Sequence, residues 1–294
     1  MTDATTSTPA AKIDRDGFPT RFRYWMMDDP VAAIGLAVLI GIVLCAIFAD
    51  WIAPYDPTLQ DYGAMLEAPS AAHWLGTDDL GRDVFSRLIH GASASVYAAF
   101  LAVGVASVIG IPVGLIAGYA GGWTDEVISR ILDTFLSFPA IVLAIAVTGV
   151  LGIGLTNAML SVGIVFAPQL ARLARARTLV LKQELYVDAA RCFGASTATI
   201  LGRHILPNAI QPVLVQITLL MAVALLAEAS LSFLGLGIQP PDPSWGSMIA
   251  RAYIYAQIAP AQIYAPGLAI LVTALAFNTV GESLREVLDP TARR

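Results

Sequence analysis

The chain has 294 residues, of which 57% are hydrophobic and 13% charged, and its mean hydropathy is +0.71. Because a soluble domain usually carries about a quarter charged residues, this composition excludes an ordinary soluble protein and indicates a chain dissolved in lipid. The formal net charge of -5 argues against nucleic acid as a partner.

The chain begins with a polar, basic segment, residues 1–30, which we expect to lie in the cytoplasm. The first uncharged run, Val31–Ala49, follows it. This run is longer than the apolar part of a signal peptide and about long enough to cross a bilayer. We therefore expect residues 31–90 to form an uncleaved first transmembrane helix and an outer loop.

Four further charge-free stretches predict the remaining spans. One of them is long enough for two spans, and its turn signal at Leu151–Asn157 predicts a break there. With six spans, most of the 17 Lys and Arg residues lie on the side of the N-terminus, whereas five spans would place most of them outside. The positive-inside rule therefore selects six spans with both termini cytoplasmic. The stretches are Gly91–Thr124, Thr134–Ala171, Ile205–Ala227 and Ala252–Gly281.

The division of the chain follows from these spans. We expect a five-helix core over residues 91–285, which includes a basic cytoplasmic loop at 172–207, and a cytoplasmic tail at 286–294. The second span carries small residues at helical spacing on one face, which allow close helix packing in lipid. These residues are Gly110, Gly114 and Gly118. Four tryptophans near span ends fit an aromatic belt at the membrane surface, namely Trp51, Trp74, Trp123 and Trp245.

Glu228 lies near the outer end of the fifth span, where an acid is costly. Two interpretations stay open. In one, Glu228 is a candidate translocation-path residue that attracts a peptide amino terminus, so that Glu228→Gln would slow transport without uncoupling ATP hydrolysis. In the other, Glu228 is a buried acid that is hydrogen-bonded to a neighbouring helix. In the outer loop, Asp78, Arg82 and Asp83 could pair and fix the loop.

The chain lacks the sequence patterns of an enzyme or a metal site. No GxxxxGK[ST] phosphate loop occurs, so we expect no ATP or other cofactor on this chain. No catalytic constellation is visible, and no His/Cys cluster suggests a metal. The two cysteines, Cys45 and Cys192, lie far apart and are expected to be free thiols.

The cytoplasmic loop has the pattern of a docking element. A short helical stretch presents Asp188, Ala189 and Ala190, Gly194 ends it, and Leu206-Pro207 restarts the chain into the fifth span. Paired alanines offer a flat surface for close approach, and nearby charged residues supply a polar rim.

This loop resembles the signature of the binding-protein-dependent ABC importer permeases: Glu-Ala-Ala, three residues, Gly, nine residues, Ile, one residue, Leu-Pro. The chain keeps the spacing but has Asp188 at the Glu position and His204 at the Ile position. The segment 204–208 is similar to the variant of the dipeptide/oligopeptide/nickel branch. The segments 75–83 and 228–246 resemble the same branch.

The resemblance implies an all-α, type I ABC importer permease fold with six transmembrane helices in the bacterial inner membrane. It implies a homologous second permease subunit, an extracytoplasmic substrate-binding protein and two ATPase subunits that hold ATP and Mg. The ATPase-coupling loop would use Asp188, Ala189, Ala190, Gly194, Leu206 and Pro207.

The sequence leaves alternatives open for the transported substrate and for the class of transporter. Small peptides, dipeptides above all, are the main expectation, and the same architecture could import glutathione or nickel complexes. A different class, the stand-alone secondary transporter, would need intramembrane relays or inverted repeats, and neither is evident beyond Glu228. The loop at 188–207 would also have no purpose in such a protein.

Overall fold

The computed structural model describes residues 29–288, with side chains up to residue 285. The described part is helical and contains no β-strand; its one isolated bridge joins Thr77 and Asp83. The predicted all-α architecture is therefore confirmed, whereas most of the N-terminal segment and of the tail lies outside the described residues. The longer helices are α2 (Pro30–Ile47), α4 (Val84–Ala120), α5 (Gly122–Ser137), α6 (Ala140–Leu151), α7 (Leu155–Leu181), α10 (Leu206–Phe233), α11 (Trp245–Ile254) and α12 (Ala261–Leu288).

The helices account for five spans, or six if a bent pair is one span. The continuous candidates are α2, α4, α7, the helical run Thr197–Phe233 and α12. The pair α5 and α6 is bent by 97°. Residues before proline avoid helical geometry, and Phe138, before Pro139, is extended, so α5 stops there. Sequence reasoning predicted the break at 151–157, where α6 ends at Leu151 and Gly152 caps it, but missed the bend at Pro139 and the start of this span at Gly122.

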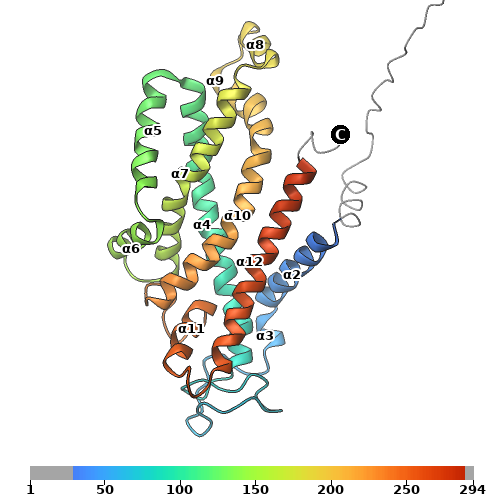
Figure 1. Cartoon of the computed structure of the whole chain (residues 1–294), viewed down its shortest axis with the longest axis vertical. Coiled ribbons are helices and arrows are strands. Elements are labelled where there is room, and N and C mark those ends of the chain that lie inside the picture. Colours follow the sequence, from blue (N-terminus) through green and yellow to red (C-terminus); the bar gives the residue numbers. More distant parts are fainter. Residues whose placement is uncertain (1–28, 289–294) are drawn as a thin grey trace, which may run out of the picture.

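The two ends of the bundle differ. Figure 1 shows the short helix α8 (Leu185–Cys192) and the end of α12 toward one end, with residues 53–83 covering the other. We call residues 53–83 the cap. The short helix α3 (Ala49–Ile52) leads from α2 into it.

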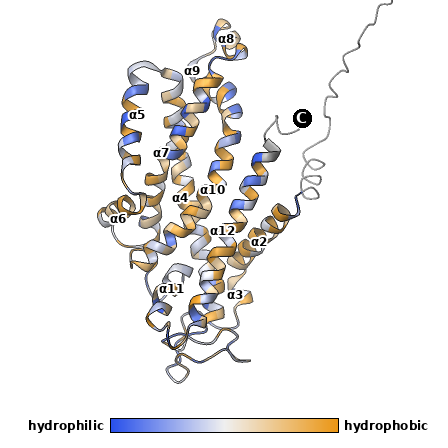
Figure 2. Cartoon of the chain, in the orientation of Figure 1, coloured by the Kyte–Doolittle hydropathy of each residue, from blue (hydrophilic) through white to orange (hydrophobic). Residues whose placement is uncertain are grey.

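The helix α2 contains no charged residue, and the face of it seen in Figure 2 is largely hydrophobic. Its buried residues are only Ala32 and Gly35, and a Cβ on Gly35 would lie 2.3 Å from Thr279 Oγ1 of α12. A helix that is apolar all round and exposed on most faces needs lipid as its surroundings. The helix α2 is thus a peripheral span that packs on α12 through Gly35 and on α4, where Ser93 Oγ donates to Ala46 O at 2.7 Å.

The glycines of α4 allow a close approach of α4 to α7. A Cβ on Gly110 would lie 2.4 Å from Ala167 O, and one on Gly114 would lie 2.2 Å from Ala171 O. A Cβ on Gly118 would lie 2.7 Å from Thr178 Cβ. All three glycines therefore face α7, where only glycine permits the backbone contact.

The four tryptophans do not behave alike. Trp51, Trp74 and Trp123 are exposed, as an aromatic belt requires. Trp245 is 2% exposed, and its indole Nε1 donates to Leu88 O of α4 at 2.9 Å. The belt expectation is wrong for Trp245, because the loop before α11 folds back and inserts this ring between helices.

Candidate functional site

The helix α8 carries the residues of the predicted coupling loop and stands out from the end of the bundle (Figure 1). It buries one residue, Val187, which is fully buried in a cluster with Leu115, Ile200, Ile205 and Ala209. Leu185 is 85% exposed and Phe193 is 91% exposed. These two apolar side chains are therefore free of packing within the chain and open to contact from outside it.

The two alanines of the motif take different positions on α8. Ala189 is exposed, and Ala190 is half-buried against the Val187 cluster. Asp188 is exposed and pairs with Arg191, their Oδ1 and Nη1 atoms lying 3.1 Å apart. The helix therefore presents a small-residue face beside a neutralised charge pair and two apolar side chains.

Gly194 ends α8 in a left-handed conformation with φ of 78°. Gly194 N donates to Arg191 O at 2.9 Å, and Ala195 N donates to Ala190 O at 3.0 Å. These two bonds form a Schellman motif, which satisfies the last carbonyls of the helix. The sequence therefore places a glycine where the chain must reverse out of α8.

Arg191 joins α8 to the end of α4. Its Nε donates to Tyr119 Oη at 3.4 Å, and its guanidinium carbon lies 5.3 Å from the centre of the Tyr119 ring. This bond raises the pKa of Arg191 above its ordinary value, so the side chain stays charged. Burial, with a smaller contribution from Glu184, raises the pKa of the Tyr186 phenol.

The helix of the fifth span does not start at Leu206-Pro207 as the sequence suggested, because the helical run already begins at Thr197. A π-helical turn, η1 (Ile200–Ile205), runs directly into α10, in which Pro207 stands in the first turn. A proline has no N–H and its ring crowds the preceding turn, so the wider turn accommodates Pro207 without ending the helix. Leu206 is half-buried against the Val187 cluster, and the His204 ring lies 6.5 Å from the Tyr186 ring.

A second site of interest is an open cavity of about 310 Å³ beside α10. Its wall is apolar apart from Ser230 and includes Ala140, Val162, Phe166 and Val223, from α6, α7 and α10. The bend between α5 and α6 lays α6 across the bundle and so contributes this wall.

Glu228 does not line this cavity. It is fully buried between helices, where Ser232 Oγ donates to Oε1 at 2.7 Å and Ser95 Oγ of α4 donates to Oε2 at 3.4 Å. Trp245 N donates in turn to Ser95 Oγ at 3.4 Å. The structure agrees with the second interpretation left open by the sequence, in which Glu228 is a buried acid that is hydrogen-bonded to a neighbouring helix. Contact with a translocated molecule stays a prediction.

This placement changes the expected effect of substitutions at Glu228. We expect Glu228→Gln to keep transport near the wild-type rate, because an amide can accept from Ser232 and donate to Ser95. Glu228→Leu leaves both hydroxyls without this acceptor and should lower stability by about 1–3 kcal/mol per unsatisfied group. Thermal unfolding and uptake of both variants check this; slow transport by a stable Glu228→Gln variant would support the path interpretation.

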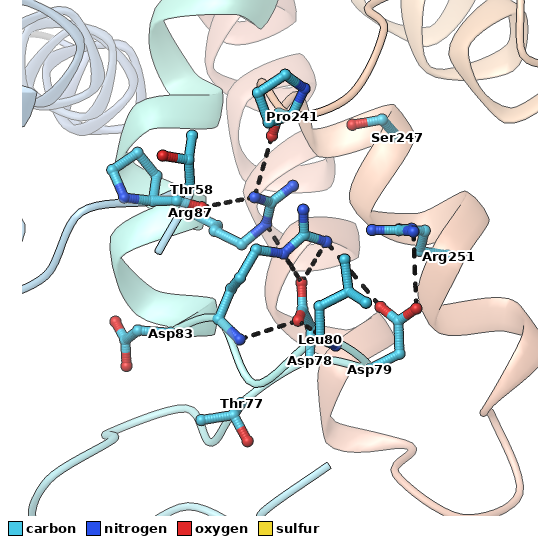
Figure 3. A network of polar contacts seen from close by, with 12 residues as sticks. Thr58, Thr77, Asp78, Asp79, Leu80, Asp83, Arg87, Pro241, Ser247 and Arg251 are labelled. Atoms are coloured by element: carbon cyan, nitrogen blue, oxygen red, sulfur yellow. Dashed lines mark hydrogen bonds and ion pairs between the residues drawn. The ribbon is translucent and has the colours of Figure 1, made fainter. Parts of the chain in front are cut away.

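The cap is fastened to the helices by a network of charges and carbonyls (Figure 3). Arg82 Nε donates to Asp78 Oδ2 at 2.7 Å, as the sequence suggested. Arg87 Nη1 donates to Pro57 O at 2.6 Å and to Pro241 O at 3.3 Å. On α11, Arg251 lies 3.7 Å from Asp79. The network thereby ties the cap to α4, to the loop at 234–244 and to α11.

Asp83 does not take part in the expected pairing with Arg82. Its Oδ2 accepts from the backbone N and the hydroxyl of Ser86, both at 2.7 Å, and so caps α4. Its Oδ1 lies 2.9 Å from His73 Nδ1. The sequence signal for this role was an acid three residues before a serine at the start of an apolar helix.

Two family models match the chain. One, "Binding-protein-dependent transport system inner membrane component", matches residues 110–294. The other, "N-terminal TM domain of oligopeptide transport permease C", matches residues 25–69.

Curated relatives match over most of the chain. The glutathione transport system permease protein GsiD of Pectobacterium atrosepticum is 45% identical over 270 residues, which are 92% of this chain and 89% of that protein. The dipeptide transport system permease protein DppC of Alkalihalophilus pseudofirmus is 42% identical over 260 residues, which are 88% of this chain and 86% of that protein.

A solved structure shares the fold. An inward facing conformation of the MetNI methionine ABC transporter matches with a TM-score of 0.56 and 21% identity, over 69% of this chain and 96% of that chain. The predicted importer permease fold is confirmed by this likeness.

Proposed function

Since the chain belongs to the family of binding-protein-dependent transport system inner membrane components, and is thus a permease subunit of an ATP-driven importer, we propose that α8 is its ATPase-coupling element. Two ATPase subunits would hold ATP and Mg at the α8 end. A homologous second permease would complete the translocation path, and an extracytoplasmic binding protein would deliver substrate at the cap end.

The observation that carries the proposal is the setting of α8. Phe193 and Leu185 are almost fully exposed, while one fully buried residue, Val187, ties the helix to α4 and α10. A helix that only packed against its own chain would bury its apolar side chains. The apolar side chains of α8 are instead left exposed, as expected for residues that bind another subunit.

The anchoring of α8 also explains how ATP could drive transport. Movement of α8 would pass through the Val187 cluster to Leu115 of α4 and to Ala209 of α10. Packed clusters of this kind move as units. Closure of the ATPase pair would therefore move α8, and the packed cluster would transmit this movement to α4 and α10. The importer would then alternate between inward-open and outward-open states, biased by ATP bound on other subunits.

The membrane orientation follows from the same assignment. If the ATPases bind α8, the α8 end faces the cytoplasm, and the ends of the chain attached to α2 and α12 lie there too. Arg172, Arg175 and Arg177 lie in the C-terminal part of α7 and Lys182 directly follows it, toward the α8 end, as the positive-inside rule requires. We therefore place the chain in the bacterial inner membrane with the cap outside.

Small peptides, from dipeptides to the tripeptide glutathione, are the proposed substrates. Two relatives above 40% identity are named for glutathione and dipeptide transport. The cavity beside α10 offers apolar walls with the hydroxyl of Ser230, which supplies little basis for selecting one small peptide over another. Selection would then lie mainly in the binding protein.

Uptake by the reconstituted importer tests this function. Proteoliposomes that hold the complete complex should accumulate a labelled dipeptide when ATP and the binding protein are present, and excess unlabelled glutathione should compete if one binding protein serves both. Vanadate should stop uptake and a protonophore should not. The reverse pattern, loss with the protonophore and persistence with vanadate, would instead indicate a secondary transporter.

A further inference from the structure

A small cavity lies where the cap meets α4, α11 and α12. Its volume is about 20 Å³. A water molecule needs at least about 10–15 Å³, so the cavity has room for one water or for one monatomic ion. Its lining includes Asp78 and Arg82 of the cap, Arg87 of α4, Met248 and Arg251 of α11, and Gln262 of α12.

The charged side chains around this cavity carry an excess of positive charge. Arg82, Arg87 and Arg251 contribute three guanidinium groups to the lining. The lining contains a single carboxylate, that of Asp78. Asp79 lies just outside the lining and faces Arg251 at 3.7 Å (Figure 3). Even with both acids counted, one positive charge stays unbalanced among the described residues at the cavity.

The Asp78 carboxylate is already shared among several donors. Its Oδ1 accepts from the backbone N of Leu80 at 2.9 Å and from the backbone N of Arg82 at 3.0 Å. Its Oδ2 accepts from Arg82 Nε at 2.7 Å and lies 3.5 Å from Arg87 Nε. A carboxylate offers about four lone-pair positions. Asp78 therefore has little capacity left for further arginine N–H groups.

The Arg82 guanidinium keeps an unsatisfied donor beside the cavity. Arg82 is 1% exposed, and its Nη2 has no hydrogen-bond partner among the described residues. Nη2 forms an ion pair with Asp78 Oδ2 at 2.6 Å, but this contact lacks the geometry of a hydrogen bond. Because a buried charged donor without an acceptor is costly, the N–H groups of Nη2 call for an acceptor in the cavity.

Arg87 has hydrogen bonds but no carboxylate of its own. Its Nη1 donates to Pro57 O and Pro241 O, which are neutral acceptors. Its ion pair is with Asp78 Oδ2, the oxygen that Arg82 already holds. Carbonyl groups satisfy N–H donors without cancelling their charge. The unbalanced charge is therefore located at Arg82 and Arg87, at the wall of the cavity.

We propose that this cavity binds a single halide ion, in practice chloride. The ion would accept from Arg82 Nη2 and would balance the third arginine of the lining. A water molecule could accept the same hydrogen bond but would leave the charge unbalanced. The cavity is too small for a phosphate, a sulfate or the end of a peptide. Since its walls come from the cap, α4, α11 and α12, the ion would be a structural ligand that holds the cap on the helices.

Thermal unfolding of the full-length chain, purified in detergent without chloride, tests the proposal. Replacement of gluconate by chloride at constant ionic strength should raise the Tm by about 2–4 °C and should saturate, because a ligand that binds only the folded state stabilises it. Bromide should act in the same way. Equal Tm values in gluconate and chloride would overturn the proposal and would indicate that the cavity holds water.

Met248 allows a matched pair of variants for this measurement. It is buried, unbranched and part of the cavity lining. Met248→Glu supplies a carboxylate in place of the ion and should therefore remove the response of the Tm to chloride. Met248→Gln has nearly the same shape without the charge and should keep the response. A full chloride response in a folded Met248→Glu variant would contradict the site.

Direct detection of the ion in the wild type does not depend on whether the variants fold. Crystals of the wild-type chain grown in bromide should give one anomalous peak beside Arg82 Nη2, and radioactive chloride should bind at about one ion per chain with saturation. The absence of a peak in the cavity, or peaks only at the protein surface, would overturn the proposal. These measurements need no ATPase subunit, so their outcome is independent of the function proposed for α8.

Discussion

Gly114→Val is expected to abolish accumulation of the folded chain. A Cβ at this position would lie 2.2 Å from Ala171 O and 2.8 Å from Ala174 Cβ. Neither atom belongs to a flexible side chain that could move aside, so the collision cannot be relieved by a change of rotamer. The helices α4 and α7 would have to separate along their length, where overpacking of even modest size costs about 1–3 kcal/mol and a backbone collision costs more. We expect no monodisperse peak in detergent after size-exclusion chromatography.

Gly104 supplies the matched control for this prediction. It lies on the same helix, and a Cβ there would meet no atom within 4 Å. Gly104→Val should therefore give wild-type yield and thermal stability. A normal, stable peak for Gly114→Val would mean that α4 and α7 do not approach as closely in the membrane as the structure has them.

The double variant Leu185→Asp/Phe193→Asp is expected to weaken ATPase binding by roughly a thousandfold, and so to lower ATP-dependent uptake strongly, while the chain stays folded. Both side chains are almost fully exposed, so their removal affects no packing within the chain. Central apolar residues of an interface contribute about 2 kcal/mol or more each, and two of them account for this factor if their effects add. Uptake in proteoliposomes, normalised to folded protein, measures the loss.

A control at the opposite end separates docking from a general effect of added charge. Ile258 follows α11 and is about as exposed as Leu185. Ile258→Asp should leave ATPase binding intact. If Leu185→Asp/Phe193→Asp transported normally, α8 would not be the coupling element.

The spans could be predicted from the sequence because absence of charge over a sufficient length is a local property. The break at Gly152 and Gly154 was visible for the same reason, since glycines in an apolar run signal a turn. The bend at Pro139 was not, because that proline lies in the part of the uncharged run before Leu151, which was interpreted as a single span. Only the direction of α6 across the bundle reveals it.

The candidate sites divide in a similar way. The spacing of Gly110, Gly114 and Gly118 predicted a close helix contact but could not identify α7 as the partner. Gly194 was predicted to end its helix, which the Schellman bonds explain. The environment of Glu228 could not be predicted, since it depends on Ser95, far away in sequence, and on the insertion of Trp245 beside it. Such contacts come from tertiary folding and leave no periodic signal in the sequence.

The most direct test of the coupling assignment is co-purification of the ATPase subunits with this chain after detergent solubilisation. Wild type and Ile258→Asp should each retain both ATPase subunits, whereas Leu185→Asp/Phe193→Asp should lose them and still elute as a folded protein. Retention of the ATPases by the double variant, or their absence from the folded wild type, would contradict α8 as the site through which ATP drives this permease.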